Sequence, residues 1–186
     1  FLFHLGIQGI IGGYLGVDVF FVISGYLITR ILKDAAAAGS FSFFSFYARR
    51  IRRLFPALIV MTALCLLVGI AELSPLRLVE LATSGIWSLL SASNFYFYLN
   101  NGYFDAAAEN QIFLHTWSLA LEEQFYLIWP IIIHLLVSLI AGGGELVFIV
   151  ILCLFGTQLS FWATAIDPSM AFYMMPFRTA EFALGA

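Results

Sequence analysis

LFPALIVMTALCLLVGIA, residues 54–71, contains no charged side chain. A helix of this length and character can cross a bilayer hydrocarbon core of about 30 Å. A second run, LVFIVILCLFGTQLSFWATAI at 146–166, has the same property. The two runs predict an all-α fold, a polytopic transmembrane helical bundle.

The composition of the whole chain supports that fold class. Of its 186 residues, 62% are hydrophobic and 10% are charged, and the mean hydropathy is +1.00. Soluble domains typically carry about 25% charged residues, so a soluble class is excluded. Cys65 and Cys153 both lie inside apolar runs, where a cysteine is usually a small buried apolar residue. We therefore expect neither a disulfide framework nor a metal site.

The two ends of the chain bear on its domain organisation. It begins at Phe1 rather than Met, and it has no basic segment or cleavage site typical of a signal peptide. It stops at EFALGA (181–186), where another apolar segment begins. We therefore expect residues 1–186 to be a partial membrane domain, a fragment truncated at both ends.

Most of the positive charge lies between residues 30 and 53. Six of the eight basic residues are there, namely Arg30, Lys33, Arg49, Arg50, Arg52 and Arg53. An excess of Lys and Arg in a short loop marks the cytoplasmic side, which predicts that residues 30–53 are cytoplasmic. RRIRR at 49–53 is either a topology anchor that faces anionic lipid or a set of guanidiniums that binds phosphates. Both can hold.

The first third of the chain is predicted to contain the end of one membrane span, a second span and a basic segment that leads to a third helix. Residues 1–12 are the predicted end of one span, 12–16 an outer turn and 16–29 the span that returns to the cytoplasm. The aromatic stretch 41–47 is predicted to lie in the membrane interface. The next helix, over about 54–71, has Pro56 in its first turn, where the missing N–H costs little.

The rest of the chain leaves one question of topology open. If residues 81–99 span the membrane, HTWSL at 115–119 faces the cytoplasm, and if they do not, HTWSL faces outside. The other predicted segments are an external link at 72–80, a polar loop at 100–111, a helix from about 116 to 140, a break at 142–144, a span at 146–166 and a loop at 167–178.

Ionisable residues gather in LHTWSLALEEQFY, residues 114–126. On a helix, one face would carry His115, Ser118, Glu122 and Tyr126, with Thr116 and Glu123 beside them. A carboxylate in a membrane segment usually faces a polar cavity or a partner, which favours a functional role. The alternative is a pair of carboxylates solvated at the interface. A serine hydrolase triad is disfavoured, because the chain has no G-x-S-x-G turn.

Two further polar residues lie near the start of the chain. His4 is a candidate general base, with a hydrogen-bonded histidine inside the bundle as the alternative. Asp18 begins a membrane segment and can orient a histidine or lie among the lipid headgroups. Ser24 and Gly25, in the middle of that segment, are predicted to allow close helix packing.

The ordered motifs resemble the acyltransferase-three family of integral membrane acyltransferases. The motifs are GVDVFFVISGYLIT (16–29), FYARRIRRLFPAL (46–58), NFYFYLNNGYF (94–104), LHTWSLALEEQFYLIWP (114–130) and FYMMPFRTAEFALGA (172–186). Bacterial members O-acylate lipopolysaccharide O-antigen, peptidoglycan or other surface glycans. The resemblance covers nearly the whole chain and identifies the family, not the substrate.

The resemblance implies roles for particular residues. His4 matches the family histidine that precedes the GVD motif, which implies a catalytic role, and we predict that Asp18 orients it. Glu122 and Glu123 are implied to line the reaction chamber, and we expect His115 and Ser118 to contact the substrate there. Arginines are implied to bind the phosphates of cytoplasmic acyl-CoA, namely Arg49, Arg50, Arg52 and Arg53. Arg178 and Glu181 match the FR-x-x-EF element and are assigned to substrate binding.

The sequence therefore leads to one hypothesis and two rivals. The hypothesis is a membrane O-acyltransferase of the bacterial inner membrane that uses acyl-CoA, in particular acetyl-CoA, and acts on a surface glycan or lipid-linked sugar. Its expected partners are membrane lipids, the glycan and an extracytoplasmic domain or protein, with no nucleic acid. The rivals are a multispan transporter of glycans or small metabolites and a non-catalytic membrane scaffold.

Overall fold

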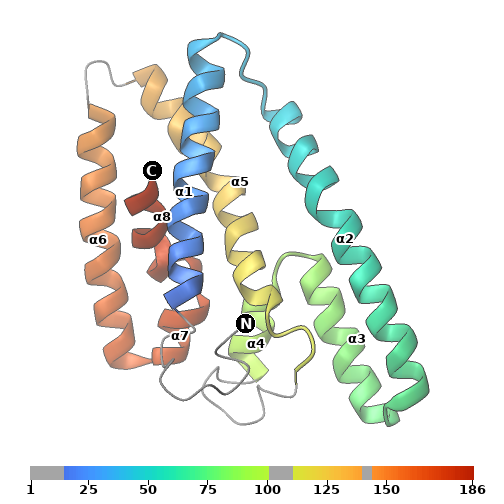
Figure 1. Cartoon of the computed structure of the whole chain (residues 1–186). Coiled ribbons are helices and arrows are strands. Elements are labelled where there is room, and N and C mark those ends of the chain that lie inside the picture. The colour runs from blue at the N-terminus through green and yellow to red at the C-terminus, as the bar shows by residue number, and fades with distance from the viewer. Residues whose placement is uncertain (1–14, 101–110, 140–143) are drawn as a thin grey trace.

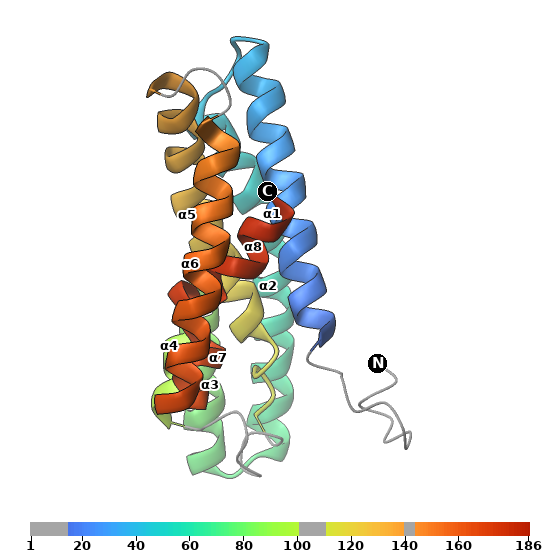
Figure 2. The same ribbon diagram turned by 90° about the vertical axis from the view of Figure 1, so that its left-hand side faces the viewer.

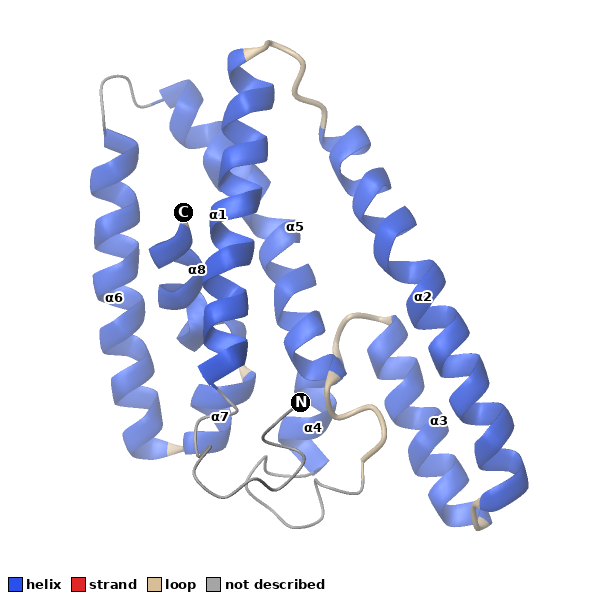
Figure 3. Ribbon diagram, in the orientation of Figure 1, coloured by secondary structure: helices blue, strands red, loops and turns tan. Residues whose placement is uncertain are grey.

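The computed structural model describes residues 15–100, 111–139 and 144–186, and every regular element within them is helical (Figure 3). The long helices are α1 (Leu15–Ala37), α2 (Phe43–Glu72), α5 (Thr116–Leu139) and α6 (Gly144–Ile166). The shorter elements are α3 (Pro75–Leu89), α4 (Ser93–Asn100), α7 (Pro168–Tyr173), the 3₁₀-helix η2 (Met175–Arg178) and α8 (Thr179–Gly185).

The four long helices are apolar and long enough to cross a membrane, and no others are among the described residues. Helices α1, α5 and α6 stand together, whereas α2 leans away from them and packs against α3 (Figure 1). The predicted all-α helical bundle is thus confirmed. Much of the surface of α2 and α6 is apolar and exposed, as expected of helices that face lipid.

The direction of α5 follows from its contacts with α1. Residues of α1 meet residues of α5 in rising order along both helices. The ring of Phe21 lies 6.3 Å from that of Trp117. Further along, Trp129 Nε1 donates a hydrogen bond of 2.7 Å to Thr29 Oγ1. The two helices are therefore parallel and begin at the same end of the bundle, opposite to residues 30–53 (Figure 1).

Residues 81–99 do not form one span. They belong to α3 and α4, which are separated at Ser91, a residue with a φ of 54°. With 15 and 8 residues, the two helices are about 22 and 12 Å long, too short to cross about 30 Å of hydrocarbon alone. The described topology thus corresponds to the alternative in which HTWSL lies at the end opposite to residues 30–53.

Two predicted boundaries are wrong around the basic residues. Helix α1 continues to Ala37, and α2 begins at Phe43 rather than near residue 54. Ser42 caps α2 by accepting a hydrogen bond of 3.4 Å from the N–H of Ser45. Phe46, expected in the interface, is 2% exposed. Pro56 lies inside the helix, where it removes one backbone hydrogen bond.

The predicted loop at 167–178 is also wrong, because it contains two short helices. Asp167 caps α7, its Oδ1 accepting hydrogen bonds of 2.9 and 3.0 Å from the N–H groups of Ser169 and Met170. The hydrogen bond from Met170 is the largest effect that lowers the pKa of Asp167 below its ordinary value. The cap turns the chain back into the bundle at the end of α6.

Glycines allow α8 to lie between α1 and α6 (Figures 1 and 2). A Cβ atom at Gly25 of α1 would overlap the carbonyl oxygen of Phe182, so the close packing predicted for Ser24 and Gly25 is confirmed. A Cβ atom at Gly156 of α6 would approach the backbone nitrogen of Ala180 to 2.9 Å. Helix α8 therefore fits only because both neighbours lack a side chain at these positions.

Three stacked phenylalanines form the centre of this packing. Phe182 of α8 lies 4.6 Å from the ring of Phe21 on α1 and 4.3 Å from the ring of Phe125 on α5. All three side chains are at most 1% exposed. This aromatic layer separates two groups of polar residues along α1.

Candidate functional site

The first polar group is built around Glu122, which is 5% exposed. Its Oε1 accepts hydrogen bonds from Ser24 Oγ on α1 and from the Tyr126 hydroxyl one turn further along α5. The Tyr126 hydroxyl also lies 3.5 Å from Ser24 Oγ. The predicted adjacency of Glu122 and Tyr126 is thus confirmed. A carboxyl group at this depth needs such partners, because burial without them is costly.

Arg50 is the arginine of the basic cluster that reaches this group. Its Cζ lies 4.6 Å from the centre of the Tyr126 ring and 5.7 Å from that of Phe46, distances that permit cation–π interaction. Successive helical residues differ by about 100° in direction, which explains why neighbouring arginines do not share this contact. The side chains of the other three arginines in this cluster are exposed, namely Arg49, Arg52 and Arg53.

Glu123 lies beside this group with one oxygen unsatisfied. Its Oε1 is buried and has no hydrogen-bond partner among the described residues. Arg50 interacts with it electrostatically. We refer to Ser24, Glu122 and Tyr126, with Arg50 and Glu123, as the Glu122 cluster. It combines a hydrogen-bonded carboxyl group, an unsatisfied carboxyl oxygen and a cation.

The predicted polar face does not extend evenly to the start of α5. His115 precedes the first residue of α5 and is exposed. Ser118 Oγ donates a hydrogen bond of 3.2 Å to the carbonyl of His115. The hydroxyl that bonds Glu122 comes instead from Ser24. His115 and Ser118 therefore lie at the entrance to α5, outside the hydrogen bonds of the Glu122 cluster.

The second polar group joins α1 to the end of the chain. Arg178 forms ion pairs with Asp18 and, at 3.1 Å, with Glu181. Its guanidinium also lies 5.8 Å from the Phe21 ring. We call Asp18, Arg178 and Glu181 the Arg178 cluster. Its side chains are mostly buried, and the atoms Arg178 Nε and Glu181 Oε2 have no hydrogen-bond partner among the described residues.

The two clusters are stacked along α1. Asp18 and Ser24 are six positions apart, or about 9 Å along a helix, and the aromatic layer lies between them. The predicted role of Asp18 in orienting His4 concerns a residue outside the described part of the chain. The contact that the structure shows for Asp18 is the ion pair with Arg178.

A third set of polar contacts was not predicted. Gln124 Nε2 donates hydrogen bonds of 3.2 Å to the carbonyl of Ser91 and 2.9 Å to Asn94 Oδ1. Asn94 Nδ2 in turn donates a bond of 3.1 Å to the carbonyl of Tyr173. These contacts join α4, α5 and α7 and fix the rotation of α5 beside Glu122 and Glu123. An amide next to two glutamates in an apolar run was the available signal.

No group of three or more His, Cys, Asp or Glu side chains within residues 15–100, 111–139 and 144–186 could hold a metal ion. Cys65 and Cys153 are free thiols. The described side chains of the two clusters carry carboxyl groups, hydroxyls and guanidiniums.

Comparison with known proteins shows the family to which the chain belongs. The family model described as an acyltransferase domain matches residues 1–186. The chain belongs to the acyltransferase-three family. The motif order in the sequence had predicted this membership, which is now confirmed. No solved structure matches the chain.

Three bacterial proteins are similar in sequence to this acyltransferase-three chain. An uncharacterized protein of Haemophilus influenzae is 44% identical over 64% of the chain and 49% of its own length. The peptidoglycan O-acetyltransferase OatA of Listeria monocytogenes is 36% identical over 92% of the chain and 28% of its own length. The putative peptidoglycan O-acetyltransferase YrhL of Bacillus subtilis is 34% identical over 98% and 30%, respectively. The chain thus spans half or less of the length of these relatives.

Proposed function

We propose that residues 1–186 form part of a membrane O-acetyltransferase that moves an acetyl group from acetyl-CoA to a hydroxyl of a cell-envelope glycan. The observation that carries this proposal is the Glu122 cluster, a buried carboxyl group beside a cation in the middle of a membrane bundle. Peptidoglycan is the favoured acceptor, because the Listeria relative is named as a peptidoglycan O-acetyltransferase.

The donor is bound at the start of α2. Coenzyme A carries several phosphate groups, and guanidiniums bind phosphate oxygens through paired hydrogen bonds. The exposed residues Arg49, Arg52 and Arg53 supply these contacts in the proposal. Arg50 belongs both to this basic stretch and to the Glu122 cluster through its contact with the Tyr126 ring, so it marks the direction in which the thioester enters. In this proposal, residues 30–53 lie on the cytoplasmic side of the inner membrane.

Transfer needs one proton acceptor. In the direct form, the acceptor hydroxyl attacks the thioester carbonyl and His4 takes its proton. The C–O ester bond forms, the C–S bond breaks, and the imidazolium returns the proton to the departing thiolate. In the alternative form, the neutral His4 imidazole attacks the thioester carbonyl, and the C–S bond breaks to release the coenzyme A thiolate. The acceptor hydroxyl then takes the acetyl group from the imidazole, and its proton passes to the thiolate. Either form requires a neutral imidazole, with Glu122 or Glu123 binding the acceptor or carrying the proton.

The Arg178 cluster is the proposed contact for the acceptor. Arg178 Nε is a donor and Glu181 Oε2 an acceptor, and both lack a partner among the described residues. A sugar hydroxyl can accept a hydrogen bond from the first and donate one to the second. His115 and Ser118 lie at the same end of the bundle, where a glycan or an extracytoplasmic partner domain approaches.

The test uses the full-length protein in cells that lack other surface O-acetylation. Ester-linked acetate is released from the envelope with mild base and quantified for wild type, His4→Ala and Glu122→Gln at equal membrane levels. We expect acetate in wild type and a loss of about 10²-fold or more in both variants. Glu145→Gln is a matched control, because Glu145 pairs with Lys33 near the last residue of α1 and is not part of either cluster. This variant should retain the wild-type amount of acetate.

The outcome separates the proposal from its rival. Equal acetate in wild type and both variants would remove His4 and Glu122 from the chemistry. A transporter would move substrate without consuming acetyl-CoA, so thioester consumption in membranes is measured alongside. Substrate flux without that consumption would replace the acyltransferase proposal by the transporter.

A further inference from the structure

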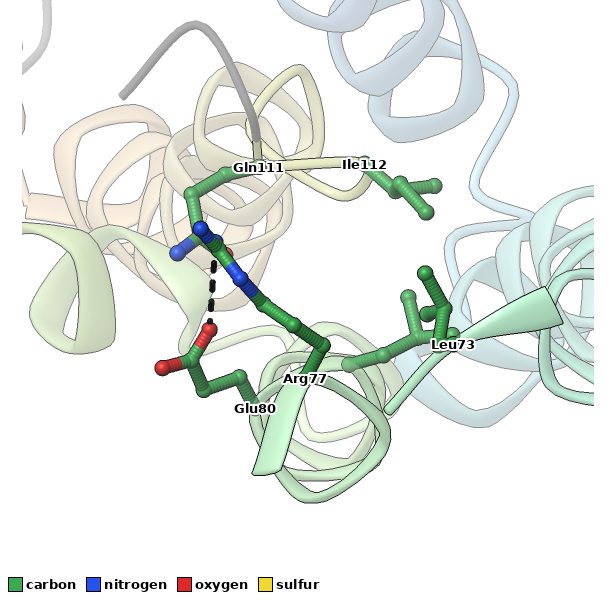
Figure 4. Close-up of a pocket in the computed structure, with 6 residues that line it drawn as sticks. Leu73, Arg77, Glu80, Gln111 and Ile112 are labelled. Atoms are coloured by element: carbon green, nitrogen blue, oxygen red, sulfur yellow. Dashed lines mark ion pairs between the residues drawn. The ribbon is translucent and has the colours of Figure 1, made fainter. Parts of the chain in front are cut away.

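A hollow of about 270 Å³ lies beside the turn between α2 and α3, apart from both clusters (Figure 4). Its polar side chains are Arg77, Glu80 and Gln111. In Figure 4 the side chain of Arg77 extends toward Glu80, and the two form an ion pair of 3.5 Å. Leu73 and Ile112 form the opposite wall.

A second hollow, of about 280 Å³, shares that wall. It too is lined by Leu73 and Ile112, and its remaining lining is almost wholly apolar. Its other lining residues are Leu64, Cys65, Val68, Gly69 and Glu72. A polar hollow and an apolar hollow of similar size are thus contiguous.

The two hollows differ in depth along the membrane normal. Arg77 is two positions after the first residue of α3, so it lies close to the end of the bundle. Leu64 is eight positions before the last residue of α2, which puts it about 12 Å from that end of the helix, whereas Arg77 lies about 3 Å from the start of α3. The polar hollow therefore lies near the end of the bundle, where headgroups are expected, and the apolar hollow extends about 9 Å deeper than Arg77, toward the acyl chains.

The charges limit the kind of headgroup that fits. The polar hollow carries one cation, Arg77, and one anion, Glu80, and both side chains are about half exposed. An anionic headgroup would meet Arg77 but also Glu80 and Glu72. A headgroup with a phosphate and an ammonium joined by two carbons can satisfy both charges at once. A primary ammonium can also donate hydrogen bonds to a carboxylate, which a quaternary ammonium cannot.

We propose that the paired hollows beside the α2–α3 turn bind one phosphatidylethanolamine molecule. Its phosphate contacts Arg77 and the amide of Gln111, and its ammonium contacts Glu80. One acyl chain lies against Leu64, Cys65 and Val68. The site is independent of acyl transfer and lies at the end of the bundle opposite to the basic cluster.

The experiment is native mass spectrometry of the delipidated full-length protein with three phospholipids of identical acyl chains. Phosphatidylethanolamine, phosphatidylglycerol and phosphatidylcholine are added in equal amounts. We expect wild type to retain phosphatidylethanolamine about two- to fivefold over the other two, the range that a partly exposed ion pair supports. Equal retention of all three in wild type would overturn the proposal.

Two variants test whether the preference for phosphatidylethanolamine arises at the paired hollows. Arg77→Gln with Glu80→Gln should reduce it to about equal retention, and a preference that persists in this double variant would contradict the site. Ile112→Trp fills the shared wall without changing a charge and should also lower phosphatidylethanolamine retention. The matched control is Arg30→Gln with Asp34→Asn, another exposed ion pair, of 3.9 Å on α1, which should keep the wild-type preference. Melting temperatures in detergent confirm that each variant is folded.

Discussion

The Glu122 cluster and the Arg178 cluster both attach to α1, but they satisfy their charges in different ways. Two neutral hydroxyls, from Ser24 and Tyr126, hold Glu122. In the Arg178 cluster, two carboxylates share one guanidinium. Removing one member of an ion pair leaves an uncompensated buried charge, whereas a carboxyl group held by hydroxyls can be replaced by an amide that keeps an acceptor oxygen. We therefore expect substitutions in the Glu122 cluster to cost less stability than substitutions in the Arg178 cluster, which also maintains the fold.

The largest expected effect comes from Arg178→Met. This change leaves Asp18 and Glu181 without their cation, and we expect the free energy of unfolding to fall by about 3 kcal/mol. Glu122→Gln should cost about 1 kcal/mol or less, because the amide oxygen can still accept both hydroxyl hydrogen bonds. Thermal unfolding in detergent compares the two. Equal destabilisation would show that the clusters do not differ in the way described.

A smaller effect is expected where α8 touches α1. Gly25→Ala places a methyl group against the carbonyl oxygen of Phe182, and we expect it to destabilise the protein by about 1–3 kcal/mol. The change disturbs both clusters, because Gly25 adjoins Ser24 and α8 begins next to Arg178. Gly16→Ala is the control, since a Cβ atom there meets nothing within 4 Å. If the two alanine variants melted alike, the close packing of α8 would be refuted.

Gln124→Ala tests whether the amide contacts hold the Glu122 cluster in place. The variant loses the hydrogen bonds to Ser91 and Asn94, and we expect a cost of about 1–2 kcal/mol. Acetate transfer should fall further than stability does, because α5 can then rotate about its axis. Gln124→Glu has the same length but carries two acceptor oxygens and no amide donor, so it should lose the same two hydrogen bonds as Gln124→Ala. Wild-type transfer in both variants would mean that the rotation of α5 is set elsewhere.

The smallest expected effect lies outside both clusters, at the cap of α7. The pKa of Asp167 is lowered, first by the hydrogen bond from the N–H of Met170. Its stabilising contribution is therefore fully present above the ordinary value of 3.8 and is lost as the pH falls through the lowered value. Asp167→Asn should remove this acid-dependent part of the melting curve while leaving the Arg178 ion pairs intact. An unchanged acid dependence in Asp167→Asn would assign it to other carboxylates.

Local patterns predicted more of the Glu122 cluster than of the Arg178 cluster. Glu122 and Tyr126 are four residues apart on one helix, so their contact follows from helical periodicity. Asp18 and Arg178 are 160 positions apart, and nothing in either local sequence indicates the pairing. The inward direction of Arg50 was likewise not predictable, because it depends on where α2 begins. The predicted start, near residue 54, differs from the observed start at Phe43.

The apolar runs and the motif order were enough to predict a helical membrane bundle of the acyltransferase-three family. Long uncharged runs leave few alternatives in a hydrocarbon solvent, where the backbone must satisfy its own hydrogen bonds. Three features became known from the folded chain alone. Residues 81–99 form two short helices, α1 and α5 run in parallel, and Ser24 and Arg50 meet the glutamates of α5. These outcomes depend on contacts between segments far apart in the chain, whose energies no local pattern contains.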